Sequence, residues 1–406
     1  MELTAKPREH GFDEARLERI RKWAGGYVDC GKLPCAMTVI ARHGDIVFTD
    51  LQGYADTEVG EAITFDHRFR IFSMTKPITA AAAMGLVEEG RLRLDDPVSR
   101  YIPAFADTRV LAHRDADIDD TVAMTSPMTI HQLLNHTSGL TYGFFDPESP
   151  LAERYQSLDL DMNPNGTPLD EWANDLASVP LAFQPGERWN YGVSTDLLGR
   201  IIEIIEERPL SDVLQERFFD PLGMMRTGFA VSRADASTLA SLYKVTSKGG
   251  MSLMDPGATS GFIAPVTRHH GGGGLVSVAE DYLKFTEMLR RGGELNGVRI
   301  LSPHSVRLMT SNNLGGDLES MGQPKFGESN FRGIGFGLGM AVVLDPARAH
   351  LMTSPGEYFW GGAASTVFWV DPLQDMVVLF LTQLYPSSTY PLREELRALV
   401  SQAIVE

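Results

Sequence analysis

The spacing of hydrophobic positions predicts strands toward both ends of the chain and helices in its middle. Apolar residues fall on one face of a helix across residues 12–25, and two β-rich runs then flank His43-Gly44-Asp45, as in a hairpin. From Leu94 to Tyr243 the patterns are those of helices and irregular loops. A predicted helix at 279–290 follows. Strand-like runs come next, at 336–344, 366–370 and 376–382, and a last helix is predicted at 391–405.

This order favours an α/β fold of the α+β type, in which an antiparallel sheet is flanked by helices. We expect residues 1–93 and 244–406 to form this discontinuous sheet domain. Residues 94–243 are expected to form a mostly helical inserted domain, with the active site between the two.

Composition limits the class of protein without giving its function. The 406 residues are 43% hydrophobic and 22% charged, which is ordinary for a globular protein with a substantial core. The net charge of −17 argues against nucleic acid or an anionic membrane as a partner. No run approaches the ~20 apolar residues of a membrane span, and the first residues lack the apolar core of a signal peptide. From the lack of both segments we expect a cytoplasmic protein. Cys30 and Cys35 alone indicate neither a disulfide framework nor a zinc site, so we expect no metal.

The segment Ser73-Met74-Thr75-Lys76 carries the most chemical information. The small apolar residues after it predict a helix to about Glu89, which would place Ser73 and Lys76 one turn apart on one face. A hydroxyl at the positive end of a helix, beside an amine, can become a nucleophile. The alternative is a helix N-cap with a solvated lysine. The same spacing recurs at Ser241 and Lys244 in a polar segment, and we interpret that copy as structural.

Acyl transfer by such a serine also needs a proton relay and an oxyanion hole. Tyr191 precedes a predicted helix, where its phenol could relay protons beside an ammonium group. The segment 359–365 has two glycines next to a strand, which allows a close approach to the backbone and a main-chain oxyanion donor. Taken singly, these features also suit an interface tyrosine and a strand bulge.

In this order, the three elements resemble the serine β-lactamase and penicillin-binding protein superfamily. Three other phrases resemble its class C branch and related esterases: 133–140 (LLNHTSGL), 272–277 (GGGLVS) and 335–339 (GFGLG). Class C enzymes have Tyr-x-Asn where this chain has Tyr191-Gly192-Val193, and Lys-Thr-Gly where it has Trp360-Gly361-Gly362. The amide and the cation that would bind a β-lactam are therefore missing. The Trp-Gly-Gly sequence is similar to that of family VIII carboxylesterases and of statin side-chain acyltransferases.

The resemblance implies a β-lactamase/transpeptidase-like fold and a serine carboxylesterase that hydrolyses neutral, short-chain acyl esters through an acyl-enzyme on Ser73. Lys76 and Tyr191 would form the base system, although a free lysine has a pKa near ~10.4 and would need burial or a cationic environment. The backbone amides of Ser73 and Ala363 would form the oxyanion hole. The substrate-binding residues would be Trp360, Gly361, Gly362 and Val193. The implied partner is a small-molecule ester, and no cofactor is required.

Three other functions stay open: a β-lactamase or D-amino-acid peptidase, an acyltransferase to an alcohol or amine acceptor, and a catalytically silent ligand-binding module. A Ser-His-Asp triad on a Gly-x-Ser-x-Gly turn is not favoured, because no such pentapeptide occurs. We interpret His136 as structural, and His269-His270 lack a third ligand for a metal. The loops 144–165 and 312–333 are expected to shape the mouth of the pocket.

Overall fold

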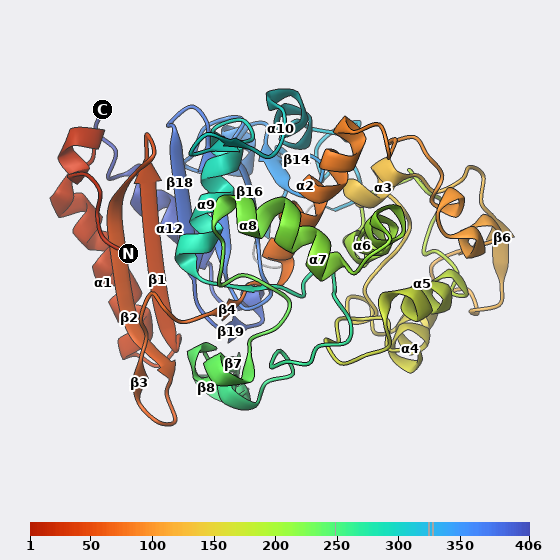
Figure 1. The fold of residues 1–406 in the computed structure, drawn as a ribbon, viewed down its shortest axis with the longest axis horizontal. Helices are drawn as coiled ribbons and strands as arrows, with labels where there is room; N and C mark the ends of the chain where they lie inside the picture. The colour runs from red at the N-terminus through yellow and green to blue at the C-terminus, as the bar shows by residue number, and fades with distance from the viewer. Residues whose placement is uncertain (248, 324, 327–328) are drawn as a thin grey trace.

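An antiparallel sheet, at the left of Figure 1, joins the two ends of the chain. In the computed structural model, which describes residues 1–247, 249–323, 325–326 and 329–406, eight of the described strands form this sheet in the order β14-β15-β16-β17-β18-β1-β2-β3. The hairpin of β1 and β2 pairs with β18, so that Val39 lies opposite both Thr49 and Leu379. The predicted sheet built from both termini is therefore confirmed. Its strands are β1 (Cys35–Arg42), β2 (Asp45–Asp56), β3 (Glu61–Ala62), β14 (Ile334–Phe336), β15 (Ala341–Val343), β16 (Tyr358–Gly361), β17 (Val367–Asp371) and β18 (Met376–Leu381).

Helices cover both faces of this sheet, which explains why β1 and β18 are buried at every position. On one face, α1 (Glu14–Asp29) packs beside α12 (Leu392–Ser401) (Figure 1). On the other face, α9 (Ala279–Arg290) contacts β17 and β18. Each helix turns an apolar stripe toward the sheet, as the sequence pattern predicts.

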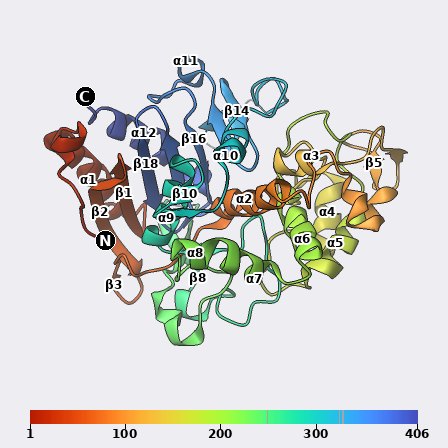
Figure 2. The same cartoon turned by 45° about the horizontal axis from the view of Figure 1, so that its top comes forward.

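The segment between the two parts of the sheet is mainly helical and lies at the right of Figure 1. The helix α2 (Thr75–Glu88) runs from the sheet toward α3 (Ile130–Leu134) and α6 (Ser194–Glu206), as Figure 2 shows. It is buried along most of its length. This burial explains its run of alanines, because small side chains let neighbouring elements approach closely. The other elements here are β5 (Arg109–Leu111), β6 (Thr121–Ala123), α3 (Ile130–Leu134), α4 (Pro150–Ser157), α5 (Leu169–Ala177), α6 (Ser194–Glu206), α7 (Leu210–Leu214), a π-helical turn (Gln215–Phe219) and α8 (Asp220–Leu222).

One predicted strand is wrong. Residues 336–344 do not form a continuous strand, because the chain turns between β14 and β15 and Gly339 adopts a φ of 91°. A Cβ on Gly339 would lie 2.4 Å from the Cβ of Ala80 in α2. The glycine therefore serves a close contact with α2, which a pattern of alternating glycines does not reveal.

Shorter elements complete the structure. The described helices include none that is both long and apolar enough to cross a bilayer. The remaining described strands and α-helices are β4 (Phe69–Arg70), β7 (Leu242–Val245), β8 (Met251–Asp255), β9 (Val276–Ser277), β10 (Glu294–Leu295), β11 (Val298–Arg299), α10 (Pro303–Met309), β12 (Lys325–Phe326), β13 (Ser329–Asn330), α11 (Pro346–Ala349) and β19 (Leu384–Tyr385).

Candidate active site

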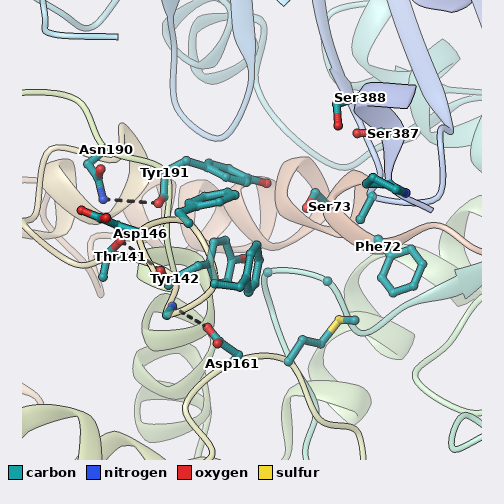
Figure 3. A pocket seen from close by; sticks show the side chains of 18 of the residues that line it. Phe72, Ser73, Thr141, Tyr142, Asp146, Asp161, Asn190, Tyr191, Ser387 and Ser388 are labelled. Carbon is teal, nitrogen blue, oxygen red and sulfur yellow. Dashed lines mark hydrogen bonds between the residues drawn. The ribbon is translucent and has the colours of Figure 1, made fainter. Parts of the chain in front are cut away.

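Ser73 lies in a 3₁₀ turn, Phe72–Met74, that leads directly into α2. The turn begins with Phe72 at a φ of 43°, a left-handed conformation that costs energy for a bulky residue. The Phe72 ring packs edge-on against Phe262 at 6.3 Å between ring centroids. This strained turn places Ser73 on the wall of a large cavity, at the positive end of the helix (Figure 3).

Lys76 is fully buried beside Ser73. Its Nζ atom donates to the carbonyl oxygen of Gly272 at 2.6 Å and to the hydroxyl of Tyr142 at 2.9 Å. It also lies 3.4 Å from Ser73 Oγ and 4.5 Å from the centre of the Tyr191 ring. A solvated lysine behind a helix-capping serine is therefore excluded, because the amine is held inside the site.

Tyr191 lies on the turn before α6, and its ring extends from the helical side of the cavity toward Ser73 (Figure 3). Its hydroxyl accepts a hydrogen bond of 3.1 Å from the indole N–H of Trp360. The two rings pack with centroids 5.2 Å apart. Trp360 thus contacts the tyrosine directly, in addition to lining the cavity.

The glycines after β16 bring this strand against the serine turn. A Cβ on Gly362 would lie 2.4 Å from the carbonyl oxygen of Ile71, so only glycine allows this approach. Ser73 and Ala363 both line the cavity. Within the described part of the chain, the amide of Ala363 donates no hydrogen bond. The amide of Ser73 lies in the opening turn of a helical segment, where amides lack a partner within the helix.

Val193 does not lie where the sequence-based interpretation places it. It is 1% exposed and is absent from the described residues that line the cavity, whereas Trp360, Gly361 and Gly362 all line it. The physical reason is that Val193 is the N-cap residue of α6 and packs into the core below the turn. Of the substrate-binding residues predicted from the sequence, it is the one that the fold keeps out of the cavity wall.

Tyr142 and Asp196 also belong to this site, and the sequence patterns did not identify them. Burial, together with the nearby charge of Asp196, raises the pKa of Tyr142 well above its usual value. Burial alone would raise the pKa of Asp196, but the hydrogen bond from His270, the charge of Lys76 and the hydrogen bond from the amide of Gly272 hold it below its usual value. The available signal was weak: Tyr142 comes just after the phrase 133–140, and Asp196 is one acidic residue in a helix.

The cavity next to Ser73 has a volume of about 960 Å³, and aromatic residues from many segments of the chain contribute to its wall. Both predicted mouth loops contribute, through residues 144–146, 149, 151–152 and 161–162 of the first and Gly322, Gln323 and Phe331 of the second. Positions 324 and 327–328 of the second loop lie outside the described residues. The aromatic residues of the wall are Phe72, Tyr142, Phe144, Phe145, Phe183, Trp189, Tyr191, Phe331, Phe359, Trp360 and Tyr385.

Two other residues considered from the sequence, Ser241 and His136, make contacts that suit a structural role. Ser241 Oγ donates to Asp56 at 2.6 Å and accepts from the amide of Gly257 at 3.0 Å, as expected for a structural serine. His136 is fully buried among aromatic rings. Groups of three or more metal-binding side chains are absent from the described residues.

Comparisons with known proteins agree with this geometry. The sequence profile of the family described as Beta-lactamase matches residues 20–402. The chain is 38% identical to Protein Rv1367c of Mycobacterium tuberculosis over 363 residues, which cover 88% of each chain. It is 32% identical to Esterase EstB of Burkholderia gladioli over 402 residues, covering 95% of this chain and 92% of EstB. The solved structure of EstCE1, described as a hydrolase with promiscuous acyltransferase activity, superposes with a TM-score of 0.80 at 29% identity, covering 97% of this chain and 98% of EstCE1. With its Ser73 and Lys76 pair at the head of α2 and these relatives along nearly its whole length, the chain belongs to the beta-lactamase family, in the esterase-like branch of its serine hydrolases.

Proposed function

We propose that this protein is a serine carboxylesterase that hydrolyses neutral acyl esters through an acyl-enzyme on Ser73. The observation that carries this proposal is the contact between Trp360 and Tyr191 beside Ser73 and the buried Lys76. An aromatic ring stands where a β-lactam-binding enzyme of this family would place a cation. At this position the ring favours an uncharged group of the substrate over an anionic one, because a carboxylate without a partner is costly to bury.

In the first step, Ser73 Oγ attacks the carbonyl carbon of the ester while Lys76 and Tyr191 accept its proton. The amides of Ser73 and Ala363 stabilise the negative oxygen of the tetrahedral intermediate. The bond to the alcohol then breaks, and Tyr191 donates the proton to the leaving alkoxide. In the second step, water attacks the acyl-enzyme with Tyr191 as the base, which releases the acid and restores the Ser73 hydroxyl.

The cavity is large enough to bind esters with groups larger than a short acyl chain. Pockets for drug-sized ligands typically measure about 300–1,000 Å³, and this cavity of about 960 Å³ lies at the upper end of that range. A short acyl group would fill little of it. We therefore propose a neutral ester with a bulky apolar group on its acyl or alcohol side, in addition to short-chain esters.

The direct test is Ser73→Ala, assayed with a short-chain p-nitrophenyl ester. The matched control is Ser241→Ala, which removes the serine of the second Ser-x-x-Lys sequence. We expect Ser73→Ala to abolish turnover and labelling by a fluorophosphonate probe, and Ser241→Ala to keep both. Retained turnover in Ser73→Ala would exclude the proposal. A folded wild-type protein that does not label at Ser73 would instead favour a silent binding module.

A second assay separates the esterase from its relatives. The specificity constant for the p-nitrophenyl ester is compared with those for a chromogenic cephalosporin and a D-Ala-D-Ala peptide. A comparable or higher value for either would favour the β-lactamase or peptidase alternative. Esters of graded chain length then test the bulky-substrate proposal, and added alcohols test for acyl transfer, which the described activity of EstCE1 supports as a second candidate.

A further inference from the structure

A buried carboxylate stands behind the lysine of the site, and a single residue, Gly272, lies between the two groups. Asp196, in α6, is 3% exposed. Its Oδ1 atom accepts from the amide of Gly272 at 2.9 Å, and the carbonyl oxygen of the same Gly272 accepts from Lys76 Nζ at 2.6 Å. A Cβ on residue 272 would lie 2.4 Å from Asp196 Oδ2, so glycine is needed for this approach. Asp196 therefore fixes the carbonyl group that holds Lys76.

His270 does not neutralise this carboxylate. Its Nε2 atom accepts a hydrogen bond of 3.0 Å from the amide of Asn163, and an accepting nitrogen carries a lone pair rather than a proton. The ring proton is therefore on Nδ1, which lies 3.0 Å from Asp196 Oδ1 and donates to it. His270 is thus in its neutral form, and it orients Asp196 without contributing a positive charge.

The charged and titratable groups around this arrangement come from several elements. Asp161 faces Asp196 with a charge of the same sign. The negative charge of Asp196 also interacts with the buried Arg268. The guanidinium of Arg268, however, donates to Asp159 at 3.2 Å and to neighbouring carbonyl groups. His136, Tyr142 and Tyr191 surround Lys76. Among the described residues, Lys76 is therefore the cation inside the site that is available to balance Asp196.

We infer that Asp196 is a positioning residue for Lys76, and that its negative charge determines the pH at which Lys76 loses its proton and the enzyme becomes active. This inference rests on the proposed role of Lys76 in the base system. A nearby carboxylate favours the ammonium form of a lysine, and only the neutral amine can accept the proton of Ser73. Removal of the charge should let the neutral amine form at lower pH.

Asp196→Asn is the test, because the two hydrogen bonds to Asp196 meet at the same oxygen. An asparagine keeps an acceptor at that position and removes the charge. We expect the acid limb of the pH profile of kcat/KM to move to lower pH by about one unit, as a single nearby charge typically causes. The matched control is Asp161→Asn, on the same cavity wall, whose Oδ1 accepts from the amide of Gly143 at 3.0 Å. In that variant the acid limb should move less than in Asp196→Asn, because Asp161 does not bind the residue whose carbonyl group holds Lys76.

A second readout does not depend on turnover. In protein labelled with ¹³C at the lysine ε-carbons, the signal of Lys76 is assigned by its loss in Lys76→Arg and titrated with pH. It should titrate at lower pH in Asp196→Asn than in the wild type. If Asp196→Asn does not fold, Asp196→Ser removes the same charge with a smaller side chain. Unchanged titration of Lys76, an unmoved acid limb in a less active Asp196→Asn, or an equal shift in Asp161→Asn would each overturn the inference. Failure of the proposed esterase function would appear separately, as turnover that survives Ser73→Ala.

Discussion

Replacement of Trp360 by phenylalanine tests the hydrogen bond between the cavity wall and Tyr191. The substitution removes the indole N–H, which donates to the Tyr191 hydroxyl at 3.1 Å. It keeps an aromatic ring at the position where Trp360 packs against Tyr191 and Phe336, with centroids 5.2 Å away in each case. The change therefore removes one polar contact and leaves most of the apolar wall.

The expected loss follows from the charge that Tyr191 develops when it transfers a proton. A hydrogen bond between neutral groups contributes about 1 kcal/mol, and one to a charged group about 1.5–3 kcal/mol. The indole N–H should thus stabilise the phenolate form by about 0.5–2 kcal/mol more than the phenol form. Since about 1.4 kcal/mol corresponds to tenfold in rate, we expect kcat/KM to fall about tenfold, mainly through kcat.

The assay is steady-state hydrolysis of a p-nitrophenyl ester by Trp360→Phe and by the matched control Trp369→Phe. Trp369 lies in the neighbouring strand β17 and contacts Arg397, with the guanidinium carbon 5.0 Å from its ring centre. It is absent from the described residues that line the cavity beside Ser73. We expect the control to retain its kcat. An unchanged kcat in Trp360→Phe, or an equal loss in Trp369→Phe, would refute the reasoning about Tyr191.

Three further substitutions test other parts of the structure. Gly362→Ala would place a Cβ 2.4 Å from the carbonyl oxygen of Ile71, so ester turnover should fall by about tenfold or more while far-ultraviolet circular dichroism stays unchanged. Burial, with the nearby charge of Lys76, lowers the pKa of His136 well below 6.5, so the unfolded chain binds a proton that the folded chain does not. Stability is therefore retained above about pH 6.5 and lost below it, by up to about 1.4 kcal/mol per pH unit, and urea unfolding of His136→Asn should show a smaller loss. Glu357 and Arg397 form a buried ion pair at 2.9 Å, and Glu357→Gln should lower the free energy of unfolding by about 3–5 kcal/mol in denaturant titrations.

The sequence predicted those parts of the fold that depend on local patterns. The hairpin at His43-Gly44 and the helix at 279–290 appear where turn residues and apolar spacing placed them. The proximity of Ser73 and Lys76 follows from the geometry of one helical turn. The break between β14 and β15 could not be predicted, because it depends on the close contact of Gly339 with Ala80, which is far away in the sequence.

The same distinction applies to the site. The roles of Tyr142 and Asp196 could not be predicted, because they depend on segments that only the fold brings to Lys76. The sequence motif predicts Val193 on the wall of the cavity, because this residue follows Tyr191 by two positions. The start of α6 instead turns its side chain into the core. A motif aligned by sequence gives the order of residues but not the direction of each side chain.

The complete burial of Lys76 has a consequence for the fate of the acyl-enzyme. Lys76 is closed off from solvent, so water reaches Ser73 by way of the cavity. An acyl group large enough to occupy that cavity would obstruct the path of its own hydrolysis. The lifetime of the acyl-enzyme should then depend on the bulk of the acyl group: small acyl groups are released quickly as acids, and large ones stay longer on Ser73.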